Sequence, residues 1–380
     1  MIEAASLQQL RPEIAAQIAA DKYLLVQLRD EICPLRGNVH RIQSRTATSI
    51  SLVAADGGNN SIRFDPFMIQ LVRVVDSSNN EYCLEVISPT TDIELLAQRQ
   101  FEGDRPVTAL GELMAFLGVR TLPELSSMIH PAERGYPASP KWVGTYRSLV
   151  EWAILFKIIR TKDFASDTLV VFDGLLRSKL FARDNFLRMM DGIQDAIRDK
   201  WEQQHRRLYL VGVAKHSAVL ERYQTAMALE GVLTCDYPAY VEVPREVEQR
   251  AYTWWEWARG TDIETEREEL TKSIAGKMHF AKFGRGRRDP VWPVDILISQ
   301  MEDTSTILGY LLADATEGFP VPYYPRCLQK AHQNAALVDF DFEVLQNEVL
   351  RGLRDMLGAE APVLDAFSLR DPDPAQRRYS

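Results

Sequence analysis

The sequence has few of the features that mark several protein classes. Its cysteines are far apart in the chain and form no Cys-x-x-Cys pair; they are Cys33, Cys83, Cys235 and Cys327. This spacing supports neither a disulfide framework nor a zinc site. No stretch approaches the roughly 20 apolar residues that a membrane-spanning helix needs. The first residues contain no basic segment followed by an apolar core, so we predict no secretory signal and expect a cytoplasmic protein.

Positive charge is also scarce. The 380 residues include 44 Lys and Arg against 53 Asp and Glu, which leaves a net charge of -9. Proteins that coat nucleic acid by bulk electrostatics use many basic contacts, so any DNA contact of this chain must be local or assisted. The hydrophobic share of 46% and the charged share of 26% are ordinary for a globular protein with a large core.

The apolar pattern of the first half predicts a helical arm followed by antiparallel strands. Leu and Ile recur at helical spacing through residues 1–45, the predicted N-terminal helical arm. Short β-type runs separated by turns rich in Asp, Gly and Asn predict the strands Ser49–Ala55, Ser61–Phe64, Met68–Val75 and Tyr82–Ile87. Helical patterns then dominate Ile93–Met128 and Trp142–Ile159, on either side of a bridge rich in Pro and Gly.

The second half alternates between strand and helix. The predicted strands are Thr168–Phe172, Leu208–Ala214, Lys277–Phe283 and Val294–Ile298, and the helices are Asp184–His205, Ala218–Leu229, Thr304–Ala315 and Pro325–Val338. A βαβα order favours parallel pairing. We therefore predict an α/β fold, an RNase H-like mixed sheet flanked by helices, over residues 46–340 with helical insertions. Residues 341–380 are predicted to form a C-terminal helix and a mobile tail.

Two Asp-Gly pairs each follow a short apolar run. Asp56 and Asp173 are predicted at the carboxyl ends of buried strands, because the glycine after each lets the backbone turn sharply. Open α/β sheets place their ligand crevice at that edge. Carboxylates bind the hard divalent cations that phosphodiester cleavage uses. The alternative for each aspartate is that it only caps its turn.

Two further candidates lie on predicted helices. Glu151 has apolar neighbours three, four and seven positions on, and a buried carboxylate is costly unless a cation or donors compensate it. Its alternative partner is Arg147, one helical turn earlier. His332 also has apolar helical neighbours, and it is either a functional histidine or a hydrogen-bonded core residue.

Basic residues cluster in one segment. Aromatic residues interleave with Lys277, Lys282, Arg285, Arg287 and Arg288. Such a segment suits a nucleic-acid strand, and a solvated hairpin is the alternative. Lys215 and His216 follow a predicted strand and could meet a phosphate, with solvated loop residues as the alternative. The tryptophans Trp254, Trp255 and Trp257 are interpreted as core or interface residues.

Taken in order, the short motifs of the chain resemble those of the NurA nuclease family. They are Ala55-Asp56-Gly57-Gly58, Glu151 within Tyr146-Arg-Ser-Leu-Val-Glu, Leu169-Val-Val-Phe-Asp-Gly174, Val213-Ala-Lys215 and Ala331-His332. The resemblance covers roughly Ser49 to Leu337. It implies an RNase H-like core and a nuclease, dependent on Mn²⁺ or Mg²⁺, that acts on DNA ends and single strands. It also implies a homodimer that docks on a HerA-type hexameric ATPase.

The resemblance further implies roles for individual residues. Asp56, Glu151 and Asp173 would bind the metal, and His332 would act as a ligand or a proton-transfer group. Lys215 would face a phosphate. The expected function is an exonuclease and single-strand endonuclease that resects DNA ends with the ATPase, in break repair or anti-phage defence. One rival is a non-catalytic RNase H-like DNA-binding or scaffolding subunit of a motor complex, and another is a phosphatase for small esters.

Overall fold

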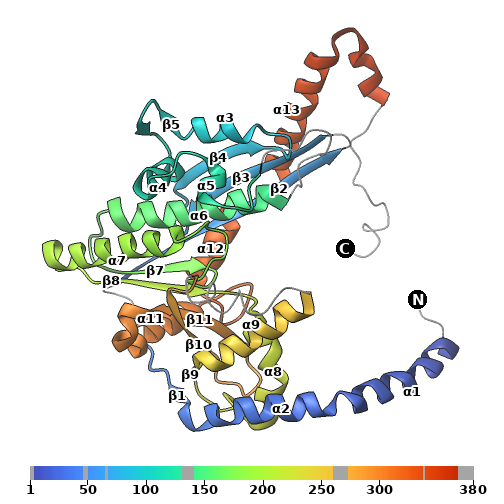
Figure 1. The fold of residues 1–380 in the computed structure, drawn as a ribbon, viewed down its shortest axis with the longest axis vertical. Helices are drawn as coiled ribbons and strands as arrows, with labels where there is room; N and C mark the ends of the chain where they lie inside the picture. Colours follow the sequence, from blue (N-terminus) through green and yellow to red (C-terminus); the bar gives the residue numbers. More distant parts are fainter. Residues whose placement is uncertain are drawn as a thin grey trace.

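A mixed sheet runs through the molecule with helices on both faces (Figure 1). The computed structural model describes residues 4–45, 50–64, 67–130, 141–259, 273–336 and 339–366. Only the backbone is described for residues 4–5, 50–64, 67–68, 254–259, 339–340, 342 and 363–366. The described strands form a nine-stranded sheet in the order β1-β9-β10-β11-β8-β7-β2-β3-β4. The predicted α/β class, a mixed sheet flanked by helices, is confirmed.

Three parallel strands form the centre of the sheet. They are β2 (Ile50–Phe64), β7 (Asp167–Asp173) and β8 (Leu208–Val213). The strands β3 (Phe67–Asp76) and β4 (Glu81–Ile87) continue the sheet beyond β2, each antiparallel to the strand before it. Beyond β8 the antiparallel strands are β11 (Val291–Leu297), β10 (Gly276–Lys282), β9 (Ala239–Glu242) and β1 (His40–Arg41).

The helices divide among an N-terminal arm, the two faces of the sheet and a C-terminal extension (Figure 1). The arm contains α1 (Ala4–Ala20) and α2 (Lys22–Ile32). The next helices in the chain are α3 (Ile93–Gln98), α4 (Ala109–Leu117), α5 (Leu122–Leu125), α6 (Lys141–Thr161), α7 (Asn185–Gln204) and α8 (Ala218–Glu230). The last are α9 (Arg245–Arg259), α11 (Thr304–Thr316), α12 (Arg326–Ala335) and α13 (Asp339–Leu357). None of the helices described here is long and apolar enough to cross a membrane.

The apolar run of β7 is continuous because both faces of this strand are covered. Side chains alternate between the two faces of a strand. Val170 and Phe172 pack into a core with α4, α6 and α7, whereas Leu169 and Val171 pack into a second core with α11 and α12. The strand therefore ends between two helix layers, and this is where Asp173 lies.

A third core lies under the N-terminal arm. It joins α2, α8 and α9 to strands β9 and β10, and its fully buried members include Ile32, Tyr223 and Phe280. Only the second of the arm's two helices contributes to this core. Figure 1 shows α1 extending away from the rest of the molecule.

The structure corrects several predicted boundaries. The segment Asp56–Asn60 was predicted as a turn between two strands, but it lies inside the single strand β2. Its residues stay extended because β3 pairs with them along the whole length, from Ala55 opposite Asp76 to Phe64 opposite Phe67. The predicted helical region Ile93–Met128 also contains a small hairpin, β5 (Phe101–Glu102) and β6 (Arg105–Pro106).

Other elements were not predicted at all. Strands β1 and β9 and helix α9 carry weak or short patterns. The third core stabilises β9 and α9, and β1 pairs with β9. The C-terminal helix is present as α13. The predicted bridge and tail fall largely outside the described residues, which omit 131–140 and 367–380.

Candidate active site

Asp173 is the last residue of β7, at the edge where the parallel strands stop pairing. Ala55 of β2 lies opposite Phe172 of β7, so the backbones of Asp56 and Asp173 follow at the same level on neighbouring strands. Neighbouring strands are about 4.8 Å apart. At Asp56, β2 stops pairing with β7 but continues to pair with β3, in which Val75 lies opposite Asp56. The two aspartate positions are thus adjacent in the backbone, although the side chain of Asp56 lies outside the described atoms.

The carboxylate of Asp173 contacts a hydroxyl and an ammonium group. Tyr324 donates a hydrogen bond from its hydroxyl to Oδ1 at 3.0 Å, and Lys215 Nζ lies 3.6 Å from Oδ2. The same ammonium lies 5.6 Å from the centre of the Tyr324 ring. The side chain of Asp173 remains 18% exposed. It is therefore oriented by partners and still open to solvent.

Two glycines shape the chain after Asp173. Gly174 has φ +139° and donates its N–H to the carbonyl of Val213 at 3.0 Å, which ties the end of β7 to the end of β8. A Cβ on Gly212 would overlap the carbonyl oxygen of Gly174. The loop after Asp173 therefore crosses closely over β8, and glycine is required at the crossing point. This brings Lys215, which follows β8, to the same edge as Asp173.

Helix α12 carries His332 to the same level of the sheet. Asn334, two residues further along α12, donates a hydrogen bond to the carbonyl of Asp76 at 3.2 Å, and its own carbonyl accepts one from Arg73 at 2.9 Å. Asp76 lies opposite Ala55, the residue before Asp56. The last turn of α12 is therefore fixed beside the Asp56 position. The side chain of His332 is exposed, so the alternative of a core histidine is wrong.

The turn of α6 that carries Glu151 lies in the opposite helix layer. The indole of Trp152 lies 4.3 Å from the ring of Phe172, which places this turn of α6 beside the end of β7. Glu151 forms the ion pair that its spacing allowed, with Arg147 Nε at 3.3 Å. Its role in metal binding stays a prediction.

The basic segment divides into a buried part and an exposed part. Lys282 is fully buried, and its ammonium donates to the carbonyls of Cys235 and Gly286. This corrects the expectation that Lys282 faces a DNA strand, because its charge is used to hold the turn. Lys277 pairs with Glu242 at 3.0 Å and is mostly covered.

Arg285, Arg287 and Arg288 are exposed on the turn between β10 and β11. Because Val294 of β11 lies opposite Val213 of β8, this turn projects beyond the carboxyl edge of the parallel strands. Within the described part of the chain, these three arginines make no hydrogen bond or ion pair.

Sequence reasoning missed Tyr324 and a buried ion network. Arg177 forms two hydrogen bonds with Asp295, at 2.7 and 2.5 Å, and a third with Glu248 at 2.8 Å. Arg177 follows Asp173 by four residues, so the network fixes the loop that leaves the site. Nothing in the local sequence marks these contacts, because the partners lie far away in the chain. The side chains of Trp254, Trp255 and Trp257 are not among the described atoms.

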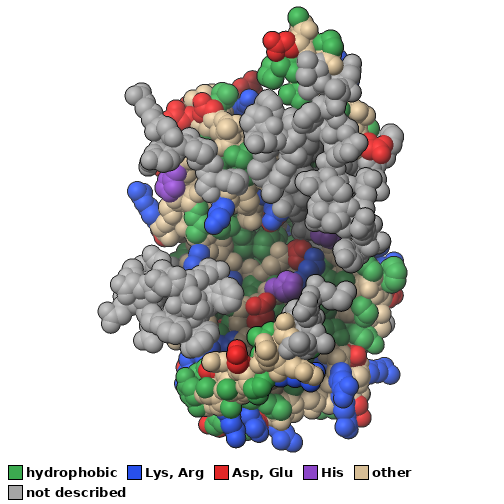
Figure 2. All heavy atoms as spheres, turned by 90° about the vertical axis from the view of Figure 1, so that its right-hand side faces the viewer, with side chains coloured by type: hydrophobic (Ala, Val, Ile, Leu, Met, Phe, Trp, Pro, Cys, Tyr) green, Lys and Arg blue, Asp and Glu red, His purple; other side chains and the backbone are tan. Residues whose placement is uncertain are grey.

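One face of the molecule is hollowed between its upper and lower halves, and acidic, basic and histidine side chains gather in the hollow (Figure 2). Among the side chains that the structure describes, no three of His, Cys, Asp and Glu are grouped closely enough to hold a metal ion. A complete ligand set would thus need the Asp56 side chain or a rearrangement of Glu151 and His332.

Solved structures of NurA nucleases are similar to this chain over nearly the full length of both. The NurA nuclease from Sulfolobus solfataricus is 13% identical, with 94% of this chain and 99% of that chain covered at a TM-score of 0.44. A NurA structure with manganese is 10% identical, with coverage of 91% and 98% and a TM-score of 0.40. A NurA structure bound to dAMP and manganese is 13% identical, with coverage of 97% and 99% and a TM-score of 0.36.

No family model and no curated protein matches the sequence. The resemblance to NurA nucleases predicted from the motifs is thus found again among solved structures. Because these TM-scores lie below 0.5, the function proposed next rests on the residues of this chain.

Proposed function

We propose that the chain is a metal-dependent deoxyribonuclease. The observation that carries the proposal is the register between β2 and β7, which brings the backbones of Asp56 and Asp173 side by side at the carboxyl edge of the parallel strands. Lys215 enters the same edge from β8. Two acidic positions beside a basic side chain suit a site that binds a cation and a phosphodiester together.

The residues present fit a divalent cation by their donor chemistry. Asp173 offers a partly exposed carboxylate oriented by a hydroxyl, and Asp56 is the adjacent acidic position. Glu151 and His332 complete the proposed ligand set. When bound, Mn²⁺ or Mg²⁺ would neutralise phosphate charge and lower the pKa of a bound water.

The other roles belong to side chains around this pair. Tyr324 holds the Asp173 carboxylate in one orientation through its hydroxyl. Lys215 would move from the carboxylate toward an entering phosphate, since the 3.6 Å separation is long for a charge-assisted hydrogen bond. His332 would transfer a proton to or from the reacting oxygen.

The DNA path proposed here uses the exposed arginines of the β10–β11 turn. Arg285, Arg287 and Arg288 project from the edge that carries Asp173. Lys277 stays a predicted contact, and Lys282 is left out because it is buried. A short basic turn agrees with the net charge of -9, since contacts to DNA would be local.

The order and direction of β4, β3, β2, β7 and β8 support the RNase H-like assignment. An antiparallel meander leads into two parallel strands with intervening helices, as the sequence predicted. We further propose exonuclease and single-strand endonuclease action on DNA ends, in repair or defence, by a cytoplasmic protein.

The partners proposed for the chain are a second copy and a HerA-type hexameric ATPase. Helix α1 supports an interaction role because its apolar side chains are exposed, including Leu7, Leu10, Ile14 and Ile18. A helix that packs so little against its own chain is suited to a partner. Replacement of Ile14 and Ile18 by Glu should shift sedimentation toward a smaller species or abolish ATPase binding. The matched change of Gln9 and Gln17 to Glu should do neither.

The nuclease proposal is tested with end-labelled single- and double-stranded DNA in Mn²⁺, Mg²⁺ or EDTA. Cleavage should require metal and should be lost in Asp56→Ala and Asp173→Ala variants that fold normally. Full activity in both variants would refute the proposal. Metal-independent DNA binding without cleavage, with or without the ATPase, would favour the scaffolding alternative. Turnover of p-nitrophenyl phosphate without any DNA cleavage would favour a phosphatase.

A further inference from the structure

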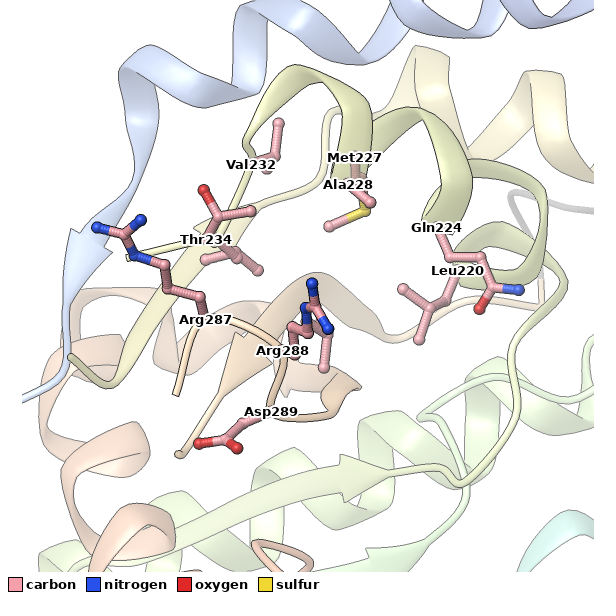
Figure 3. A pocket seen from close by; sticks show the side chains of 11 residues that line it. Leu220, Gln224, Met227, Ala228, Val232, Thr234, Arg287, Arg288 and Asp289 are labelled. Carbon is pink, nitrogen blue, oxygen red and sulfur yellow. The ribbon is translucent and has the colours of Figure 1, made fainter. Parts of the chain in front are cut away.

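A pocket of about 540 Å³ lies between helix α8 and the β10–β11 turn (Figure 3). It is separate from the carboxylate pair, although Leu220 in its wall follows Lys215 by only five residues. Its size falls within the range of pockets that hold small organic ligands. Of the roles proposed above, only the DNA path involves it, through Arg287 and Arg288.

The inner wall of the pocket is apolar. Leu220 and Met227 come from α8, Val232 and Leu233 from the segment after it, and Val291 from the start of β11. The chain turns into this wall through left-handed residues, with φ of +70° at Gly231 and +61° at Leu233. Such a surface suits a flat apolar group such as a nucleobase.

The rim of the pocket is polar and positively charged. Figure 3 shows Arg287, Arg288 and Asp289 on the turn, with Thr234 beside Arg287 and Gln224 of α8 on the far side of the pocket; the Arg288 guanidinium lies toward the middle and that of Arg287 points outward. Amide and hydroxyl groups at this rim can hydrogen-bond to a base edge. The two guanidinium groups can bind phosphate oxygens in a bidentate manner.

The turn that carries the arginines is held in one shape. A Cβ on Gly284 would overlap the Asp289 carboxylate, and Asp289 accepts a hydrogen bond from the N–H of Gly286 at 2.6 Å. From the other side, the buried ammonium of Lys282 donates to the carbonyl of Gly286 at 3.0 Å. Asp289 is therefore engaged within the turn, and a preorganised turn binds at a lower entropic cost than a floppy one.

We infer that this pocket binds a nucleobase together with its phosphate, as a free mononucleotide or as one residue of a DNA strand. Both sources present the same chemistry, a flat apolar ring a short distance from a phosphate anion. The inference deepens the proposed nuclease function and rests on it for the identity of the strand. Binding itself requires neither metal nor cleavage.

The test measures binding of thymidine 5′-monophosphate by calorimetry in EDTA, with inorganic phosphate and thymidine as separate ligands. The full chain should bind the nucleotide with a Kd of about 1 mM or tighter, and each partial ligand at least about tenfold more weakly. Arg288→Ala and Arg287→Ala should each weaken binding about tenfold, the effect of losing a charge-assisted hydrogen bond. Ala228→Trp, which adds bulk to a lining position on α8, should abolish it.

Matched variants separate the pocket from general charge and from the cleavage site. Arg285 is exposed on the same turn but does not line the pocket, and Thr225 is exposed on α8 outside it. Arg285→Ala, Thr225→Trp and Asp173→Asn should therefore bind as the parent does. Normal binding by Asp173→Asn would support the pocket even if no cleavage is ever found.

Three results would overturn the inference. The first is that the parent does not bind the nucleotide at several times the expected Kd. The second is that inorganic phosphate binds as tightly as the nucleotide. The third is that Arg285→Ala and Arg288→Ala lose equal amounts of nucleotide affinity. Binding of a short oligothymidylate then shows whether the pocket takes a residue of a DNA strand or a free mononucleotide. Tighter binding than the mononucleotide, with mutual competition, assigns the pocket to a DNA strand, and binding of the mononucleotide alone assigns it to a free nucleotide.

Discussion

Two aspartates, on the strands that flank β8 on either side, show how differently the same side chain is used. Asp295 on β11 is fully buried and receives two hydrogen bonds from Arg177. Asp173 on β7 is 18% exposed and receives a hydroxyl at 3.0 Å and an ammonium at 3.6 Å. The first carboxylate is fully buried against a matched guanidinium, whereas the second is oriented by a hydroxyl and stays partly exposed to solvent.

The surroundings of the two carboxylates distinguish a structural aspartate, Asp295, from Asp173, which is proposed to bind a metal. Burial, the largest single effect, would lower the pKa of Arg177, but Asp295, Tyr252 and Glu248 together outweigh it and hold that pKa well above its usual value. A buried pair of this kind is costly to break and has little capacity for another partner. The Asp173 carboxylate keeps access to solvent, so a cation could reach it. The comparison predicts that the two aspartates respond to substitution in opposite ways.

Asp173→Asn should produce the largest effect on activity. The change removes a charge proposed to bind the metal, so metal-dependent DNA cleavage should fall about 1,000-fold, equivalent to several kcal/mol of lost transition-state stabilisation. Stability should change by less than about 1 kcal/mol because the site is partly solvated. Asp167→Asn, at the other end of β7, is the matched control and should retain activity. Equal cleavage rates in the two variants would contradict the proposed role of Asp173 in cleavage.

Asp295→Asn should instead act on stability. It leaves the buried Arg177 without its main counter-charge, which should lower the free energy of unfolding by about 3 kcal/mol. Urea denaturation measures this change. The control is Asp195→Asn, which breaks an exposed pair with Arg198 and should cost no more than about 0.5 kcal/mol. Asp295→Asn with unchanged stability would show that the network is dispensable.

Two histidines extend the comparison to pH. Burial is the main cause that lowers the pKa of His279 from 6.5 to about 4. Nearby Glu242, the hydrogen bond to the Lys277 backbone and Asp295 oppose that effect, and the charge of Lys277 adds to it. The unfolded chain therefore binds this proton more tightly than the folded chain does. The stabilising contribution of neutral His279 is complete above pH 6.5 and is lost as the pH falls toward about 4.

The expected loss over this range is about 3 kcal/mol. Urea unfolding at a series of pH values measures it, and His279→Gln should remove this part of the pH dependence. His216→Gln, at an exposed position, is the control and should keep the parent profile. Parallel profiles for the parent and His279→Gln would contradict the assignment.

Tyr324→Phe should have the smallest effect. The ring should stay in place because it packs against Trp292 at 4.8 Å, while the hydrogen bond to Asp173 is lost. A single hydrogen bond is worth about 1 kcal/mol, so cleavage should fall about fivefold. The metal concentration for half-maximal activity should rise, which a purely structural role would not cause. Tyr310→Phe on α11 is the control, and an equal shift in that variant would refute the positioning role.

Local patterns were sufficient to predict the central strands and the position of Asp173. The run Leu169–Phe172 is apolar at every position because both faces of β7 are covered, and Asp173 marks the end of that burial. The pattern failed at Asp56–Asn60, where a sequence typical of a turn is extended. There, pairing with β3 from Ala55 to Phe64 outweighs local preference.

Local sequence patterns were enough to predict the central strands, the end of β7 at Asp173, and the gathering of basic residues on a short turn. These features depend on neighbours within a few residues. The tertiary structure, in contrast, places the backbones of Asp56 and Asp173 at the same height on neighbouring strands, brings the Tyr324 hydroxyl to Asp173, and buries Lys282. Tyr324 and Asp173 are 151 residues apart, and Arg177 and Asp295 are 118 apart. Contacts at such separations depend on sheet register and helix packing, which no local pattern encodes.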